Sequence, residues 1–391
     1  MHQRRRIRVC VFLFPAHETS LLFIVCDRWH CANSMGGMLL STVRSLFPGA
    51  MGPDGFISCF DHLIDEQDHR RTIILKGGPG VGKSTFIRRL HAALAAENEQ
   101  STLYFCSGDP DSLDAAVIPS HGLLILDGTA PHVVDPQIPG ARDSLVNLGA
   151  CLDEGAMRGR LAHIRACMAD HAACSRRARA FMQSIRALRQ EGAASVAQCI
   201  DARRFARMIQ ALTAAVLCDH HQNADVPGMR PVITDALTLK GEICLLSGEQ
   251  YARVIRLTGH TAMDLTPALQ AVSRAAQSAG LRVEEHLSPL MPGSLLHVSI
   301  PALSTLVTTG QALVSEQTFD FSACIPAASL LRRECALEQM RAGVIRHTQL
   351  AADALAQAKQ LHDELETFYV PNMDFEKWQL MFDETLNSLR A

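Results

Sequence analysis

The chain has few aromatic residues and no long hydrophobic run. Aromatic residues make up 5% of its 391 residues, with two Trp and three Tyr. It lacks the continuous stretch of about 18 apolar residues that a membrane-spanning helix requires. The formal net charge of −3 at pH 7 gives no global field that would attract nucleic acid or an acidic membrane surface. We therefore expect neither nucleic acid nor a membrane as a partner.

The thirteen cysteines lack the paired spacing of zinc-binding or redox motifs. No Cys-x-x-Cys is present, so reduced thiols in a cytoplasm are the simplest interpretation. Four residues that could bind a metal do share one face of an expected helix: His163, Cys167, His171 and Cys174. Because one straight helix cannot wrap four ligands around a tetrahedral ion, we favour the packing interface of a helical hairpin there.

The N-terminal segment imitates a secretory signal without completing one. Arginines followed by the apolar residues 7–14 resemble the start of such a signal, but Pro15 ends the run. We expect residues 1–37 to be a poorly ordered extension, with Met35 and Met38 as candidate natural starts.

Two regions of the chain carry the same order of expected elements, which predicts an internal duplication. Residues 71–130 give strand, glycine loop, helix, strand, acidic loop and strand, and residues 252–310 align with them without a gap. This alignment pairs Gly77 with Gly259. The segments ahead of the loops align with a slightly larger offset, which pairs Gly55 with Gly241. Matching Pro and Gly positions support both alignments.

A long helical region follows each of these regions. Residues 152–189 are rich in Ala, Arg and Leu, Glu191-Gly192 interrupts them, and residues 196–217 resume the pattern. This arrangement predicts a helical hairpin. Residues 330–365 repeat the pattern, and Asp374 is placed to cap a last helix.

Residues 77–84 have the spacing Gly-x-x-x-x-Gly-Lys-Ser of a phosphate-binding loop. An aliphatic and β-branched run precedes the loop, and helical apolar spacing follows it, which is the expected strand–loop–helix context. Glycines let backbone N–H groups surround an anion, and the helix adds its positive N-terminal end. We therefore expect ATP as a ligand, bound by Gly77, Gly78, Pro79, Gly80, Val81, Gly82, Lys83, Ser84 and Thr85.

A nucleotide of this kind is normally bound with Mg²⁺. We expect Lys83 to contact the β and γ phosphates and the Ser84 hydroxyl to bind the metal. The apolar strand that ends at Asp127 is typical of a Walker B segment, so Asp127 is the expected acidic magnesium residue. The alternative is that Asp127 caps an Asp-Gly turn.

Three further residues follow expected strand ends, where ligands bind in open parallel sheets. Asp109 and Asp111 could act as a base or a metal partner, and an Asx-turn is the alternative for both. His132 follows the Walker B segment and could position water or act in catalysis, although a structural role is the alternative.

Missing residues narrow the expected activity. No Glu follows Asp127, so we do not expect fast hydrolysis by the protein alone. The chain also lacks an Asn-Lys-x-Asp segment of the kind that recognises guanine, and this absence favours ATP over GTP as the ligand. In the second copy, residues 260–266 replace the glycine loop, with Leu265 at the lysine position and Thr309 at the Asp127 position. We predict that this copy keeps the fold and has lost triphosphate binding.

The chain resembles an uncharacterised group of bacterial P-loop ATPases, from about Arg44 to the end. The segments that carry this resemblance are Gly55-Phe56-Ile57 and residues 77–85, 109–114, 126–136, 362–366 and 371–375. The resemblance implies a tandem pair of P-loop domains in a bacterial cytoplasm, with ATPase or nucleotide-binding activity.

The sequence thus predicts an α/β fold of two tandem three-layer P-loop NTPase-like domains with parallel sheets, each followed by a helical hairpin. Residues 38–225 form the active domain, here the first half, and residues 226–391 the degenerate second half. We expect a Mg²⁺-dependent ATPase or an ATP-driven switch. The alternatives are a nucleotide or small-molecule kinase and a non-catalytic, nucleotide-gated protein that binds a protein partner. Each of these requires the amides near residue 80 and the Lys83 ammonium to face a cavity that no other segment covers.

Overall fold

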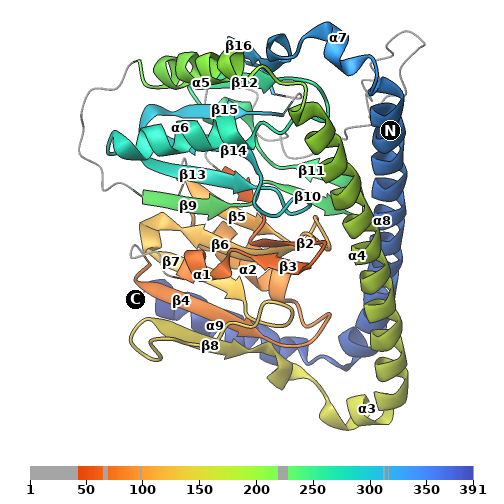
Figure 1. Cartoon of the computed structure of the whole chain (residues 1–391). Coiled ribbons are helices and arrows are strands. Elements are labelled where there is room, and N and C mark those ends of the chain that lie inside the picture. Colours follow the sequence, from red (N-terminus) through yellow and green to blue (C-terminus); the bar gives the residue numbers. More distant parts are fainter. Residues whose placement is uncertain are drawn as a thin grey trace, which may run out of the picture.

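The computed structural model describes residues 43–64, 69–96, 99–218, 228–310, 313–315 and 317–390. The expected extension at residues 1–37 lies outside the described residues. Two sheets lie next to each other, edge to edge, and a pair of long helices runs along one side of both (Figure 1).

The first sheet contains six strands, five of which run in one direction. Their order is β1 (Val43–Leu46), β5 (Ser101–Phe105), β6 (Leu113–Ile118), β7 (Leu123–Asp127), β4 (Arg71–Lys76) and β8 (Asp143–Asn147). β6 is antiparallel to both of its neighbours, so the predicted all-parallel sheet is wrong. Residues 106–112 and 119–122 are too short for the crossover of a dozen or more residues that parallel strands need, and therefore reverse the chain.

The second sheet repeats this order and these directions. Its strands are β9 (Gly228–Val232), β13 (Arg282–Leu287), β14 (Leu295–Ile300), β15 (Thr305–Thr308), β12 (Arg253–Thr258) and β16 (Gln317–Asp320). β12 begins at Arg253, which the predicted alignment pairs with Arg71, the first residue of β4.

A hairpin accompanies each sheet. β2 (Gly49–Gly52) pairs with β3 (Gly55–Ser58), and β10 (Asp235–Thr238) pairs with β11 (Gly241–Cys244). β3 begins at Gly55 and β11 at Gly241, the two glycines that the sequence paired ahead of the loops. The structure therefore confirms both predicted alignments.

The long helices pair across the two halves instead of forming a hairpin in each. α4 (Leu161–Ala197) continues through Glu191-Gly192, where the sequence predicted a break, and it packs along α8 (Glu334–Tyr369). A Cβ at Gly192 would lie 3.3 Å from the Cβ of Ala262. Glycine at this position permits close packing within a continuous helix, which corrects the predicted hairpin.

The last helix of each half covers the sheet of the other half. α5 (Ala202–Val216) packs on α6 (Thr266–Ser278). The ring centroids of Phe205 on α5 and Phe321 are 5.2 Å apart. α9 (Phe375–Arg390) lies against the first sheet and its helix α2 (Lys83–Leu94), where the rings of Phe382 and Phe86 are 5.1 Å apart. The hydrophobic core of each half thus contains side chains from both halves.

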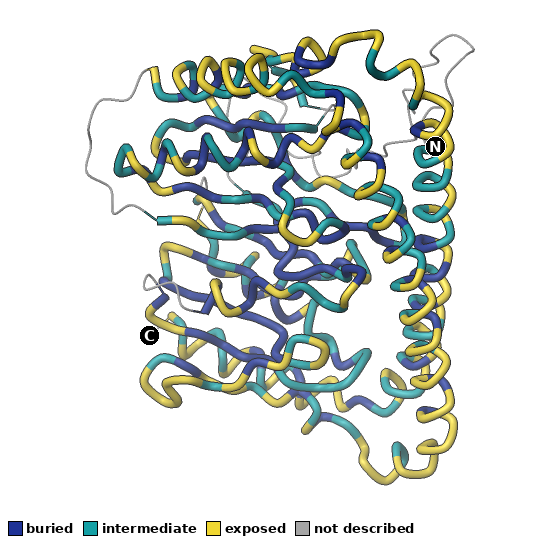
Figure 2. Tube along the Cα trace, in the orientation of Figure 1, coloured by how far each residue is buried: buried dark blue, intermediate teal, exposed yellow. Residues whose placement is uncertain are grey.

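The shorter helices connect these elements: α1 (Phe60–Ile64), α3 (Glu154–Gly159) and α7 (Ala327–Leu330). Burial is concentrated in the sheets and in the seam between α4 and α8, whose outer faces are exposed (Figure 2). Among the described helices, none combines the length and apolar character needed to cross a membrane.

Candidate functional site

The glycine loop joins β4 to α2 and is compactly folded. Gly80 and Gly82 have φ angles of 69° and 82°, left-handed conformations that favour glycine. The Lys83 ammonium donates hydrogen bonds to the carbonyl oxygens of Gly77 at 2.9 Å and Gly78 at 2.8 Å. Its Nζ also lies 3.6 Å from Oδ2 of Asp127. The lysine therefore bridges the loop and the end of β7.

Ser84 and Asp127 both have protein partners. The Ser84 hydroxyl accepts a hydrogen bond from the backbone N–H of Leu113 at 2.9 Å. Oδ1 of Asp127 accepts from the N–H of Thr129 at 2.9 Å and from its hydroxyl. Asp127 thus makes the turn-capping contact that was the alternative, while its other oxygen remains directed at Lys83. The two interpretations of Asp127 are compatible.

Asp114 is a member of this cluster that the motif did not single out. It lies on β6, beside the end of β7, and only 9% of its surface is exposed. Burial and the charge of Asp127 raise the pKa of Asp114 to about 7, so this carboxyl holds a proton at lower pH. A lone carboxylate in an otherwise apolar strand was the available sequence signal.

His132 lies close to the cluster. Its Nε2 is buried, has no hydrogen-bond partner among the described residues, and is 3.8 Å from Oδ2 of Asp114. Its ring packs edge-on against Phe60 at 4.4 Å, and burial lowers its pKa. The structure therefore places His132 near Asp114, in a mainly apolar setting that favours the neutral imidazole.

Asp109 and Asp111 lie outside the Lys83–Asp127 contact. Oδ1 of Asp109 accepts from the N–H of Asp111 at 3.4 Å, and Oδ2 accepts from the Ser112 hydroxyl at 3.0 Å, the Asx-turn of the alternative interpretation. Asp109 also lies 3.5 Å from Nζ of Lys359. Asp111 is exposed and pairs with Lys240 at 2.8 Å.

The end of α8 covers the glycine loop. A Cβ at Gly78 would lie 2.9 Å from the Tyr369 ring, and a Cβ at Gly80 would lie 2.9 Å from Val370. The His362 side chain and, to a smaller extent, the Lys359 charge and the backbone N–H of Gly80 lower the pKa of the Glu366 carboxylate. We call residues 366–370 the cover segment. The expectation of an uncovered loop is therefore wrong for this structure.

The indole of Trp378 completes the cover from α9. Its Nε1 donates to the carbonyl oxygen of Val81 at 3.1 Å, and a Cβ at Gly82 would lie 3.1 Å from that nitrogen. The Arg89 guanidinium lies 5.3 Å from the centre of the Trp378 ring. Both helices that meet the loop from the far end of the chain thus contact its backbone.

No family model, curated protein or solved structure matches this chain. Its function is therefore inferred from residue chemistry and geometry.

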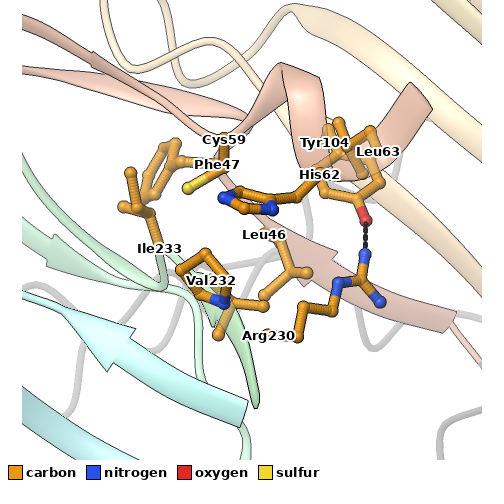
Figure 3. Close-up of a pocket in the computed structure, with 10 residues that line it drawn as sticks. Leu46, Phe47, Cys59, His62, Leu63, Tyr104, Arg230, Val232 and Ile233 are labelled. Atoms are coloured by element: carbon orange, nitrogen blue, oxygen red, sulfur yellow. Dashed lines mark hydrogen bonds between the residues drawn. The ribbon is translucent and has the colours of Figure 1, made fainter. Parts of the chain in front are cut away.

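A small cavity between the halves is a poor alternative site. It lies beside α1 and β9 and is lined by Leu46, Phe47, Cys59, His62, Leu63, Tyr104, Arg230, Pro231, Val232 and Ile233 (Figure 3). Arg230 donates to the Tyr104 hydroxyl at 3.1 Å across one side. Its volume of about 10 Å³ is near that of a single water position, so it is too small for a nucleotide.

The suggested metal face of α4 lies in the seam with α8. Cys167 and Cys174 are buried, and the Cys167 thiol donates to the carbonyl oxygen of Leu361 at 3.1 Å. The rings of His171 and His362 are 6.4 Å apart across the same seam. These contacts place the face in a helix–helix interface, but its partner is α8 of the second half and not the second helix of the predicted hairpin.

Proposed function

We propose that this protein binds ATP with Mg²⁺ at residues 77–85 and acts in the cytoplasm as an ATP-driven switch that hydrolyses ATP slowly. Both halves would then be domains of the P-loop NTPase type, with triphosphate binding confined to the first. One observation carries the proposal: Gly80 and Gly82 adopt left-handed conformations in a loop that leads into the N-terminus of α2, where the Lys83 ammonium lies 3.6 Å from Asp127. Glycines in these conformations let backbone N–H groups surround an anion, and the N-terminal end of the helix adds positive polarity.

The residue types fit the nucleotide, but the cover segment fills the space it needs. Tyr369 and Val370 lie against Gly78 and Gly80, so ATP would have to displace them together with the Glu366 carboxylate. Lys83 would then exchange a loop carbonyl for phosphate oxygens. When bound, Mg²⁺ would neutralise phosphate charge, and Ser84 and Asp127 are the residues placed to hold it.

Displacement of the cover segment supports a switch more than a simple hydrolase. The segment ends α8, and α8 packs along α4, whose Gly192 lies against Ala262 of the second half. Nucleotide binding at the loop would therefore be coupled to a helix pair that contacts both halves. A ligand that binds only the open arrangement shifts the population toward it.

The kinase alternative has less support. Asp109, the expected base for an acceptor hydroxyl, is engaged in an Asx-turn and lies beside the Lys359 ammonium. A nucleotide-gated interaction protein without turnover remains the rival, because the same displacement would expose the cover segment to a protein partner.

Titration of the full chain with Mg-ATP tests the proposal. We expect Lys83→Ala to weaken binding by about tenfold or more, since it removes the ammonium at the phosphates, and each tenfold loss corresponds to about 1.4 kcal/mol. Glu366→Ala should tighten binding several-fold, because the closed arrangement loses a negatively charged group that lies beside Gly80 of the loop. Glu364→Ala is the matched control, since it removes the same charge from an exposed position of α8. Absence of ATP binding in both the wild type and Glu366→Ala would refute the proposal.

Following phosphate and ADP by NMR separates the three activities. Slow release of phosphate without an acceptor supports the ATPase switch. Transfer only in the presence of a metabolite pool supports a kinase, and binding without any turnover supports the gated interaction protein.

A further inference from the structure

Three chemically distinct ligand atoms converge in the second half, away from the glycine loop. Asp235 begins β10, Cys244 ends β11 opposite it, and His297 lies on β14. A carboxylate oxygen, the sulfur and a ring nitrogen of these residues all lie within 4.8 Å of one another. The Nε2 of His297 is 3.0 Å from Oδ2 of Asp235.

The fold does not require these residues, because the first half builds the same elements without them. The alignment of the two hairpins pairs Asp235 with Gly49 and Cys244 with Ser58. The alignment that pairs the first residues of β4 and β12 places His297 opposite Ala115 of β6. The half that lacks the glycine loop thus carries three metal-ligand side chains where the first half has small residues.

The donor set is suited to zinc. Zn²⁺ takes thiolate, imidazole and carboxylate ligands in tetrahedral sites, whereas Mg²⁺ and Ca²⁺ select oxygen alone. Ligand atoms bound at about 2.0–2.3 Å in a tetrahedron lie roughly 3.3–3.7 Å apart. The observed separations therefore need shifts of only a few tenths of an ångström to about 1 Å to reach that geometry.

The surroundings of His297 orient it for this role. Its Nδ1 is 2.7 Å from the hydroxyl of Thr308, which also accepts the N–H of Gly310 at 2.9 Å. A partner at Nδ1 fixes the ring with Nε2 directed at the other two ligands, as metal-binding histidines are commonly held. His297 is 2% exposed, so the ring has little freedom to turn away.

Two of these residues border a cavity. Asp235 and Cys244 line a cavity of about 100 Å³ beside α4, which has room for water or a small ligand. Glu242 also lines this cavity, but it pairs with Arg189 at 2.7 Å and is held by that contact.

We infer that Asp235, Cys244 and His297 bind one Zn²⁺ ion, with a fourth coordination position open to the adjacent cavity. Three protein ligands with an open position are typical of catalytic zinc sites, whereas structural sites use four. The inference is independent of ATP binding.

Metal titration of the full chain, after treatment with a chelator, tests this site. Co²⁺ alone is the spectroscopic probe, because a thiolate ligand gives a charge-transfer absorption that oxygen and nitrogen ligands do not. Competition with Zn²⁺ then gives the zinc affinity and stoichiometry. We expect one equivalent of tightly bound zinc and a thiolate–cobalt band that zinc abolishes.

Variants that restore the residues of the first half are the sharpest comparison. Cys244→Ser should lose the thiolate band and at least tenfold in zinc affinity, and His297→Ala should weaken binding similarly. Thr308→Val should weaken binding by about tenfold through the lost partner of Nδ1. Cys335→Ser, at an exposed thiol of α8, is the control and should behave as wild type.

Two results would overturn the inference. One is a wild-type chain that binds no stoichiometric zinc or cobalt. The other is unchanged metal binding in both Cys244→Ser and Asp235→Asn, with circular dichroism showing that each variant is folded. Asp235→Asn keeps the shape of the side chain and provides the second variant should Cys244→Ser fail to fold.

Discussion

At the scale of single residues, the side chains that would bind a nucleotide already make protein contacts. The Lys83 ammonium is bound by loop carbonyls and the Ser84 hydroxyl by the Leu113 amide, while Glu366 packs against Gly80. The aligned Thr266 in the second half accepts from Leu295 at 3.3 Å, as Ser84 does from Leu113. The second half keeps this hydrogen bond although Leu265 replaces the lysine, so we assign the bond a structural role. The Lys83–Asp127 pair, in contrast, is specific to the first half.

Trp378 offers a direct readout of the loop, because its indole donates to Val81 within it. The sequence has only two Trp, and Trp29→Phe leaves Trp378 as the single indole. We expect Mg-ATP to change the emission of Trp378 in this variant, since opening the cover would alter its hydrogen bond and its burial. The same titration in a Trp29→Phe, Lys83→Ala variant should give no change at equal ATP. Unaltered emission at ATP concentrations where binding is demonstrated would show that the cover stays closed.

At the scale of elements, the exchange of α5 and α9 decides how the two sheets are covered. α9 supplies Trp378 and Phe382 to the core around Phe86, although it comes from the opposite end of the chain. α5 supplies Leu212 and Val216 to the other core. Neither sheet has its full apolar cover without a helix from the other half.

Truncation of Phe382 measures what α9 contributes. Phe382 is 4% exposed, so Phe382→Ala should lower the free energy of unfolding by about 3–5 kcal/mol. Leu380→Ala in the same helix is the control, because Leu380 is 63% exposed and its loss should change stability by about 0.5 kcal/mol or less. Urea unfolding monitored by circular dichroism gives both values. Equal effects of the two substitutions would mean that α9 is not packed as described.

At the scale of the whole molecule, a partly buried ion pair joins an edge strand of the first sheet to the second strand of the other sheet. The Arg44 guanidinium on β1 makes two hydrogen bonds with the Glu284 carboxylate on β13, at 2.8 and 2.6 Å. Burial alone would raise the pKa of Glu284, but Arg44 outweighs it and lowers the pKa to about 2. The Ser299 hydroxyl adds a hydrogen bond at 2.8 Å. This ion pair thus links two halves that already contribute side chains to each other's hydrophobic core.

This pair predicts a defined loss of stability in acid. Because the folded-state pKa of Glu284 is below its ordinary value of 4.5, its contribution is fully present above about pH 4.5 and is lost as pH falls toward 2. The shift corresponds to about 3 kcal/mol. Between pH 5 and pH 2, we expect the free energy of unfolding of the wild type to fall by about 3 kcal/mol relative to that of the double variant Arg44→Met, Glu284→Leu. A difference independent of pH would show that Glu284 titrates normally.

Features of this fold that neighbouring residues decide could be predicted from the sequence. Features that depend on contacts between residues far apart in the chain could not. The strand–loop–helix around Lys83 and the two alignments of the duplicated regions follow from local spacing, which is why they were predictable. The direction of β6 was also accessible, because the short connections on both sides exclude a parallel crossover. The continuity of α4 at Gly192 was not, since it depends on contact with Ala262 in the other half.

By itself the sequence determined the glycine loop, its lysine and acid, and the duplicated α/β regions, because backbone conformation and apolar periodicity act over a few residues. Only the tertiary structure decided that α5 and α9 exchange sheets, that Asp114 joins the Lys83 cluster, and that the cover segment lies on the loop. It also brought Asp235, Cys244 and His297 together from three strands. Such contacts join residues far apart in the chain, and which apolar or charged surfaces meet depends on the packing of the whole molecule.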